Sequence, residues 1–510
     1  MNISAGPFVS TLLALATATA DAQSPPSRPT EGPGLRPSQA MIQLDYQTVH
    51  VEGDQAIDLL GFHVHSRVAE GLDLGAGLYA PLLKGAYGGF TAFDIGVHAQ
   101  RPLAGKLFAT AGVSAGGGAG GRSVEKAKSL SGTGGFYKGY VGLGYDFGSF
   151  SLGVNVSRLK FSESPLGGTQ ADVFVEIPYA YLTGSFASHG QRLSPAEARQ
   201  ASEASGETML MVILDNYWQR NPEGTYKGHF NIVDLQYAHF LAADTYWFAD
   251  LGVGYKGLPL SNQVLGGIGQ RVRLSPGISL YGQLGIGSGI YAPEVIDTAS
   301  GLLVYPKLAA ETALTRDLGL SASAGYLVAP KGTSRNRAFG LGLTYHIRAG
   351  EGPAPTGAAG LPTYQGYRIG IFQQVDPGVR YTGIDRGALQ MLGIQADAIV
   401  SDHVYIAVQG SIAYSTYLDH PGYGELLAGI GVQSRTVPGN DWQVFGQLMA
   451  GTNVHGLAVK ASGGVRYGLG DRLALHATAG HVEARSAAGH RFSAHSVGLG
   501  LDYRFSTPSW

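Results

Sequence analysis

The chain has 510 residues, of which 78 are glycine, 14% are charged and none is cysteine, with a formal net charge of −2. The lack of cysteine excludes disulfides, thiolate metal sites and cysteine nucleophiles, and the nearly neutral charge gives no electrostatic footprint for nucleic acid. A hydrophobic content of 44% excludes disorder for most of the chain, and glycines without a Gly-X-Y period exclude collagen.

The chain begins with a short apolar segment, Phe8 to Ala20, followed by the small-x-small pattern Ala20-Asp21-Ala22. This pattern predicts a signal peptide over 1–22, although residues 2 to 7 contain no Lys or Arg. Residues 23–40 are rich in Pro, Ser and Gly and are predicted to form a flexible or extended leader. Elsewhere no apolar run reaches the roughly 18 residues of a spanning helix.

Two later segments have the composition of linkers. Residues 187–206 contain a predicted short helix, with Ser194 as N-cap, Pro195 at the first helical position and Glu197 completing a capping box. Residues 348–365 form a Pro/Gly/Ala tract. These segments divide the chain into modules at 41–186, 207–347 and 366–510.

Each module contains about eight runs with alternating apolar and small or polar residues, separated by turn-forming clusters, and each run is predicted to be a β-strand. In the first module the runs lie at 41–50, 56–67, 71–80, 88–101, 106–117, 134–147, 149–161 and 171–186. In the second they lie at 208–219, 230–241, 244–256, 263–275, 277–288, 302–314, 318–328 and 337–347. In the third they lie at 367–376, 388–400, 402–415, 424–436, 441–453, 457–469, 471–484 and 494–505.

The two faces of each run differ in a way that is unusual for a soluble sheet. From Val497 to Phe505, one face carries bulky apolar residues and the other carries Gly498, Gly500, Asp502 and Arg504. The exposed face of a soluble sheet would instead be rich in Lys, Glu, Thr and Arg. A row of small residues suits the inside of a narrow barrel, and a bulky row suits contact with lipid.

The fold predicted from this pattern is all-β, with three tandem antiparallel eight-stranded transmembrane β-barrels. The alternative is one 24-stranded barrel with a wide pore. The two long linkers argue against it, because its connections at those points would be unusually long and rich in Pro and Ala.

The last strand carries a known pattern. The segment Gly500-Leu-Asp-Tyr503-Arg-Phe505 resembles the closing-strand signal of Gram-negative outer-membrane β-barrel proteins, and Gly342 to Ile347 is a near copy. The resemblance implies location in the outer membrane, contact with its lipid and lipopolysaccharide, and recognition of Gly500, Tyr503 and Phe505 by the barrel-assembly machinery. In this chain five residues, Ser506 to Trp510, follow the signal.

The candidate site residues are charges on the predicted interior faces. They would form a salt-bridged plug or line a pore, and the plug is favoured because buried charges must be paired. These residues are Asp94, Glu176, Arg271, Glu311, Asp397, Lys460, Arg466, Asp502 and Arg504.

Other motifs were weighed and are not predicted to be sites. His63 and His65 share one strand face but have no evident third ligand, so neither a metal site nor any cofactor is expected. Residues 116–121 lack the Lys and the helix of a phosphate-binding loop and are predicted to be a mobile loop. The basic segment at 122–128 beside them is predicted to be solvated, and the alternative is contact with lipopolysaccharide head groups or a polysaccharide. The last module has a group that a lipid hydrolase could use, but Ser496 and His495 point to opposite faces; the group is His476, His481, Glu483, His490, His495 and Ser496.

These patterns predict a non-enzymatic outer-membrane protein. Its loops would serve surface binding or adhesion, or assist the export of a surface polysaccharide. The alternatives are a porin-like transport channel and an outer-membrane lipid hydrolase.

Overall fold

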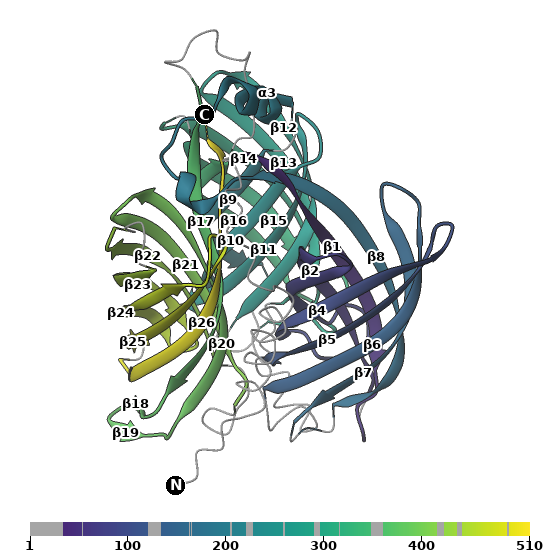
Figure 1. Ribbon diagram of the computed structural model, residues 1–510. Coiled ribbons are helices and arrows are strands. Elements are labelled where there is room, and N and C mark those ends of the chain that lie inside the picture. Colours follow the sequence, from purple (N-terminus) through teal and green to yellow (C-terminus); the bar gives the residue numbers. More distant parts are fainter. Residues whose placement is uncertain are drawn as a thin grey trace. The chain divides into compact units, whose positions relative to one another are not determined.

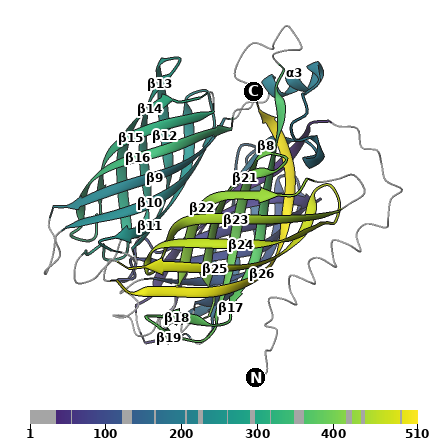
Figure 2. The ribbon, with the colours of Figure 1, turned by 90° about the vertical axis from the view of Figure 1, so that its left-hand side faces the viewer.

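The computed structural model describes residues 34–53, 55–120, 134–162, 164, 166–203, 207–220, 228–258, 261–289, 296–315, 317–347, 361–415, 423–435, 441–486 and 489–509. Most of these residues lie in β-strands, which form three closed antiparallel barrels in tandem (Figures 1 and 2). In the described segments, no helix has the length and apolar character needed to cross a membrane.

The first barrel closes through pairing of its first and last strands, β1 and β8. Along each strand the burial alternates between inner and outer residues, so the period of two seen in the sequence is the period of the barrel wall. The strands are β1 (Arg36–Val49), β2 (Ile57–Ala69), β3 (Leu72–Ala80), β4 (Phe90–Ala104), β5 (Leu107–Gly120), β6 (Gly135–Asp146), β7 (Ser151–Phe161) and β8 (Gly167–Thr183).

The second barrel has the same up-and-down order and closes between β9 and β16. Its strand bounds differ from the predicted ones by two residues at most, because short polar turns mark most strand ends. The strands are β9 (Thr208–Gln219), β10 (His229–Phe240), β11 (Thr245–Lys256), β12 (Asn262–Ser275), β13 (Ile278–Gly289), β14 (Leu302–Ala313), β15 (Leu318–Val328) and β16 (Arg335–Ile347).

The third barrel closes between β17 and β26, and a small hairpin, β18 and β19, extends the sheet along β26. The hairpin was not predicted, because two or three residues are too short to display an alternating pattern. The strands are β17 (Thr363–Asp376), β18 (Val379–Tyr381), β19 (Ile384–Asp385), β20 (Leu389–Ser401), β21 (Val404–Ala413), β22 (Gly424–Gln433), β23 (Trp442–Asn453), β24 (Gly456–Gly468), β25 (Leu473–Arg485) and β26 (Arg491–Ser509).

The prediction of three eight-stranded barrels is therefore confirmed, and the single 24-stranded barrel is wrong. The short helix α3 (Pro195–Glu203) is also confirmed together with its capping box. The Ser194 hydroxyl accepts from the Glu197 backbone N–H at 3.3 Å, and the Glu197 carboxylate accepts from the Ser194 N–H at 2.8 Å. The helix buries Ala198 and Ala201 in a cluster with Tyr364.

Three boundaries differ from the predictions. Strand β1 begins at Arg36, inside the predicted leader, because Arg36 to Ala40 pair with the end of β8. Residues 116–120 belong to β5 and are not a loop, because they pair with β4. Strand β26 continues past Phe505 to Ser509 by pairing with Thr363 to Gly366, so the end of the predicted second linker is also strand.

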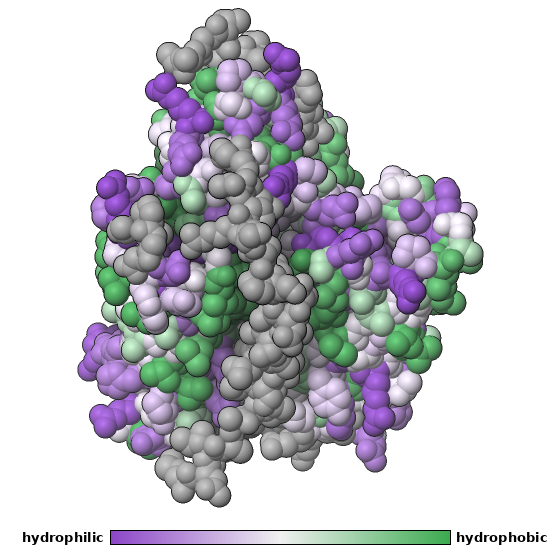
Figure 3. Space-filling view, viewed as in Figure 1, coloured by the Kyte–Doolittle hydropathy of each residue, from purple (hydrophilic) through white to green (hydrophobic). Residues whose placement is uncertain are grey.

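Apolar residues gather in two places. Inside each barrel, a buried apolar cluster closes one end. In the first barrel this is the end at which β1 joins β2, in the second the end at which β9 joins β10, and in the third the end at which β25 joins β26. On the outer walls, the bulky rows of many strands are exposed: Leu499 is 64% exposed and Ile406 is 51% exposed. Figure 3 shows hydrophobic patches of this kind on the outer surface, interspersed with hydrophilic residues.

Candidate functional site: the charged barrel interiors

Glycines on the inner faces of the strands leave space for the long side chains of the barrel interiors. A Cβ built on Gly77 of β3 would overlap the His63 ring, and one on Gly61 of β2 would overlap the Asp45 carboxylate. In the third barrel, a Cβ on Gly370 would overlap Asp502. The glycine-rich row is therefore required where a long polar side chain from one strand lies across the backbone of the next.

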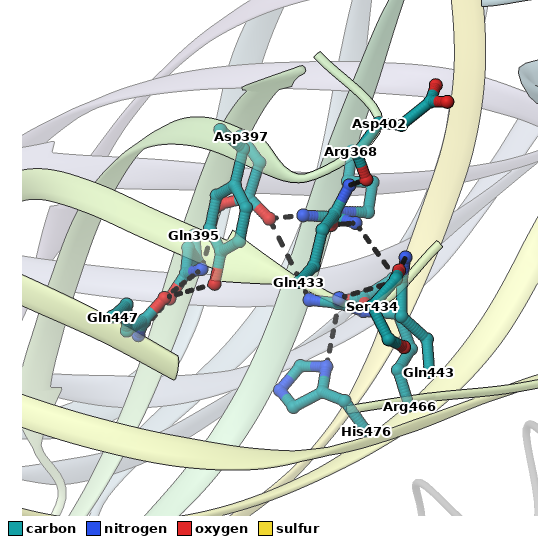
Figure 4. A network of polar contacts seen from close by, with 12 residues as sticks. Arg368, Gln395, Asp397, Asp402, Gln433, Ser434, Gln443, Gln447, Arg466 and His476 are labelled. Carbon is teal, nitrogen blue, oxygen red and sulfur yellow. Dashed lines mark hydrogen bonds and ion pairs between the residues drawn. The ribbon is translucent and has the colours of Figure 1, made fainter. Parts of the chain in front are cut away.

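In the third barrel, two buried arginines are held between carboxylates. Arg368 Nε lies 2.9 Å from Asp397 Oδ2, and Arg466 Nε lies 2.6 Å from Asp502 Oδ2. Arg466 also reaches Asp397 at 3.8 Å, and His476 Nδ1 lies 2.8 Å from Asp502 Oδ1. Figure 4 shows the Arg368, Asp397, Arg466 and His476 side chains converging inside the wall. Each ionic group has a charged partner, as burial demands.

Glutamines complete this network. Arg368 donates to Gln433 at 2.7 Å and to Gln443 at 3.4 Å. Gln395 donates to Asp397 at 2.8 Å and exchanges hydrogen bonds with Gln447 (Figure 4). Amide side chains can donate and accept at once, so they connect ionic groups that do not touch directly.

A second polar layer of the third barrel surrounds Lys460. Its ammonium donates to Gln374 at 2.7 Å and lies 3.4 Å from Glu425 Oε2. Gln374 donates to Asp376 at 2.9 Å, and the Tyr423 hydroxyl donates to Glu425 at 2.7 Å. These groups lie beside the apolar cluster that closes the barrel.

The second barrel holds one group of carboxylates around a lysine. Lys307 Nζ lies 3.1 Å from Asp215 Oδ2, which also accepts from the Tyr305 hydroxyl at 3.2 Å. Asp234 is buried in the same interior and accepts from the Gln263 amide at 2.7 Å.

At the other end of the second barrel, His346 lies between two glutamates. Its Nδ1 is 2.6 Å from Glu207 Oε1, and its Nε2 is 2.8 Å from Glu311 Oε1. Arg271 Nη1 is 2.6 Å from Glu207 Oε2, and its guanidinium carbon lies 4.1 Å from the Phe240 ring centroid. The group combines ion pairing with a cation–π contact.

The first barrel pairs the buried Lys138 with two carboxylates. Lys138 Nζ lies 2.7 Å from Asp45 Oδ2 and 3.1 Å from Asp172 Oδ2. His63 lies between Asp45, at 3.3 Å from Nδ1, and Asp94, at 3.0 Å from Nε2.

Two further histidines lie beside this group. The His65 ring lies 5.9 Å from that of His63 and 5.2 Å from that of His98. His65 Nε2 is 3.0 Å from Gln43 Oε1, and His98 Nε2 is 3.6 Å from Glu176 Oε1. In the described residues, no group of three or more metal-ligating side chains is arranged to hold a metal ion.

A small cavity lies in the first barrel among these polar groups. Its volume is about 20 Å³, which is room for about one water molecule. Because its walls include charged side chains already paired across the barrel, it offers no path for a solute. The lining residues are Gln43, Asp45, His63, His65, Gly75, Tyr79, Asp94, Gly96, Val97, Val113, Ser114, Lys138, Tyr140 and Asn155.

The structure buries most of the charges singled out in the sequence. Asp94 and Glu176 lie in the first barrel, Arg271 and Glu311 in the second, and the third holds Asp397, Lys460, Arg466 and Asp502. Arg504 is only partly buried, at the mouth of the third barrel, where its guanidinium carbon lies 5.4 Å from the Phe186 ring centroid. The buried charges lie inside all three barrels, and in the second and third barrels they form two groups each.

Several charges of these groups were missed, although the alternation could have identified them. Asp45 lies on the same strand face as Gln43 and Gln47, and Arg368 on the same face as Gly370. The remaining ones follow the same rule: Lys138, Asp172, Glu207, Asp215, Asp234, Lys307, His346, Asp376 and Glu425.

The hydrolase group is not assembled. Ser496 points into the barrel, whereas His481, Glu483 and His495 lie on the outer wall, and the His481 and His495 rings are 4.6 Å apart. His476 is an interior partner of Asp502 and His490 lies in the β25–β26 turn. The basic segment 122–128 lies outside the described residues, as do the predicted signal peptide and most of the leader.

Tyr503 and Phe505 of the closing-strand signal lie on the outer face of β26, whereas Gly500 lies on its inner face. Tyr503 and Phe505 share a face with their ring centroids 5.7 Å apart, and Phe505 stacks on Tyr367 of β17 at 5.8 Å. Gly500 accommodates the His476 ring of β25, which a Cβ would overlap. The signal is thus part of the seam that closes the third barrel.

Sequence comparison gives no match to a protein family and none to a curated protein. Structure comparison gives similarity to a de novo designed transmembrane β-barrel, with 13% identity and a TM-score of 0.21 over 28% of this chain and 98% of the other. A mutant of the ferric enterobactin receptor PfeA from Pseudomonas aeruginosa is 8% identical, with a TM-score of 0.28 over 93% of this chain and 81% of its own.

The FrpB iron transporter from Neisseria meningitidis is similar at the same level: 9% identity and a TM-score of 0.29, over 92% of this chain and 82% of its own. Such low TM-scores carry no argument about function. The three closed barrels rest on the strand pairing within this chain.

Proposed function

We propose that the chain is a non-enzymatic protein of the bacterial outer membrane, in which three filled barrels anchor surface loops that bind a partner. The partner role is adhesion or an accessory part in the export of a surface polysaccharide. The observation that carries the proposal is the division of each barrel into an exposed apolar wall and a charged interior with its ions paired.

The outer walls support insertion in a membrane. Leu341, Leu448 and Leu499 are each more than 60% exposed, and rows of this kind would cause aggregation on a soluble protein. In hydrocarbon, a closed barrel satisfies every backbone N–H and C=O within its own ladder. The resemblance of Gly500, Tyr503 and Phe505 to an outer-membrane assembly signal favours that membrane and insertion by the barrel-assembly machinery.

The interiors support binding rather than transport. Paired side chains such as Lys138–Asp45 and Arg466–Asp502 cross the barrels, and apolar clusters close one end of each. Eight-stranded barrels are typically filled by their own side chains, whereas wide channels need about twice as many strands. The parts left to meet a partner are therefore the loops and rims.

Single-channel recording in planar bilayers tests this proposal. The inserted full-length chain should conduct almost no ions, because its three interiors are filled. Steps of conductance like those of a general porin would contradict it and favour the transport alternative. Hydrolysis of lipid A or of a phospholipid that is lost in Ser496→Ala would contradict the non-enzymatic part.

A further inference from the structure

The outer wall of the third barrel carries a cluster of cations at one rim. Arg485 ends β25 and Arg491 begins β26, and the two residues are directly opposite each other in the strand ladder. Arg380 of β18 pairs with Ser493 of β26 on the same outer face. With the adjacent cross-strand pair His481 and His495, these residues are called the rim patch below. Like charges directly opposite each other destabilise a sheet, so the patch needs a counter-ion.

The chain itself supplies little of that counter-charge. Glu483 lies within the patch: its Oε2 is 3.6 Å from Arg491 Nη2 and its Oε1 is 3.5 Å from His481 Nε2, and all three side chains are exposed. Asp385 is opposite Arg380 in the β18–β19 hairpin, but no ion pair within 4.0 Å joins them. Among the described residues, no carboxylate lies within that distance of Arg485 either. An exposed ion pair such as Glu483–Arg491 contributes little.

The position of the rim patch relative to the apolar wall indicates what kind of anion it meets. On the outer face of β25 and β26, successive cross-strand pairs run from Arg485–Arg491 through Glu483–Ser493 and His481–His495 to Ala479–Val497 and Ala477–Leu499. The arginine pair therefore lies at the rim, and two cross-strand pairs separate it from the exposed apolar side chains. A headgroup at the level of the arginines would place its acyl chains against Val497 and Leu499, which are 53% and 64% exposed.

We propose that the rim patch binds the phosphate groups of a phosphorylated lipid in the adjoining membrane leaflet. The inference rests on the proposed function, because it requires the third barrel to span the outer membrane. Arginine matches phosphate oxygens with a planar fork of donors. Longer connections of such barrels face the cell exterior. The long β17–β20 connection, residues 377–388, is at the end that bears the rim patch, so the lipid is a phosphorylated glycolipid of the outer leaflet.

The test measures lipid retained by the purified full-length chain in detergent, by native mass spectrometry, with bis-phosphorylated lipid A as the probe. The double variant R485Q/R491Q removes the opposed cations and should lower the retained fraction about tenfold, since each charge-assisted contact to phosphate is among the stronger hydrogen bonds. The matched control is Arg435→Gln, which changes an exposed arginine that follows β22 at the opposite end of the same barrel. It should retain lipid like the unchanged chain.

Three results would overturn the inference: equal retention by R485Q/R491Q and the unchanged chain, equal retention of lipid A that lacks phosphate, or replacement of the lipid by a soluble phosphorylated oligosaccharide. Heat-modifiable gel migration of every variant shows that the barrels are folded. A chain that inserts into bilayers but retains no lipid A contradicts only the rim patch. A chain that fails to insert contradicts the proposed function itself.

Discussion

Replacing Asp502 with asparagine should strongly destabilise the third barrel. The Asp502 carboxylate is 3% exposed and accepts from both Arg466, at 2.6 Å, and His476, at 2.8 Å. Breaking a buried ion pair by removing one partner costs about 3–5 kcal/mol, because the other charge stays buried. In the variant, Arg466 still has Asp397 as an ionic partner at 3.8 Å. We therefore expect the free energy of unfolding to fall by about 3 kcal/mol, the lower end of that range.

The assay is urea unfolding of the full-length chain in lipid vesicles, followed by the fluorescence of Trp442. The chain has four tryptophans, and changing Trp218, Trp247 and Trp510 to Phe leaves Trp442 of β23 as a reporter of the third barrel. The control Asp441→Asn alters an exposed carboxylate next to the same strand and should change the free energy of unfolding by less than about 0.5 kcal/mol. If Asp502→Asn lowers the free energy of unfolding by less than about 1 kcal/mol, the Asp502–Arg466 pair is not a dry buried ion pair and the interior is hydrated.

Three further perturbations test other parts of the structure. Gly77→Ala should destabilise the first barrel by about 1–3 kcal/mol, because the new methyl overlaps His63. The control Gly139→Ala, whose Cβ would meet nothing nearer than 3.9 Å, should be nearly neutral. Heat-modifiable gel migration compares the two variants, and equal effects would contradict the role of the glycine row. Leu341→Lys on the outer wall should lower the free energy of unfolding in bilayers by up to about 2–4 kcal/mol. If the free energy of unfolding in vesicles is unchanged, that wall lies outside the hydrocarbon. Ser194→Ala should destabilise α3 by about 1 kcal/mol, seen as faster amide exchange of Ala198 and its neighbours, and unchanged exchange would show that the capping box does not hold the helix.

Much of the fold could be predicted because strand alternation is a local signal. Each residue of Val497 to Phe505 could be assigned to a face from its neighbours alone, and the structure exposes Val497 and Leu499 as expected. Turn-forming clusters fixed most strand ends. The β18–β19 hairpin and the extension of β26 to Ser509 escaped because their pairing depends on distant strands, which no local pattern reveals.

The composition of the interior could be predicted only in part. Alternation places Asp94 and Arg466 on inner faces, but it does not tell which inner charges meet. That depends on the stagger of strands around each barrel, which joins Lys138 to Asp45 across 93 positions of sequence. Sequence reasoning also could not tell that His346 lies between Glu207 and Glu311, because the three residues come from separate parts of the second module.

Lipid accessibility along β26 shows whether the bulky row of the strand faces hydrocarbon. Because the chain has no cysteine, single cysteines at 497 to 501 can carry one nitroxide each in the full-length chain reconstituted in bilayers. We expect contact with lipid-dissolved oxygen at Val497, Leu499 and Leu501, and shielding at Gly498 and Gly500. Uniform water exposure along the strand, or lipid contact at the glycine positions in place of the bulky ones, would contradict this expectation.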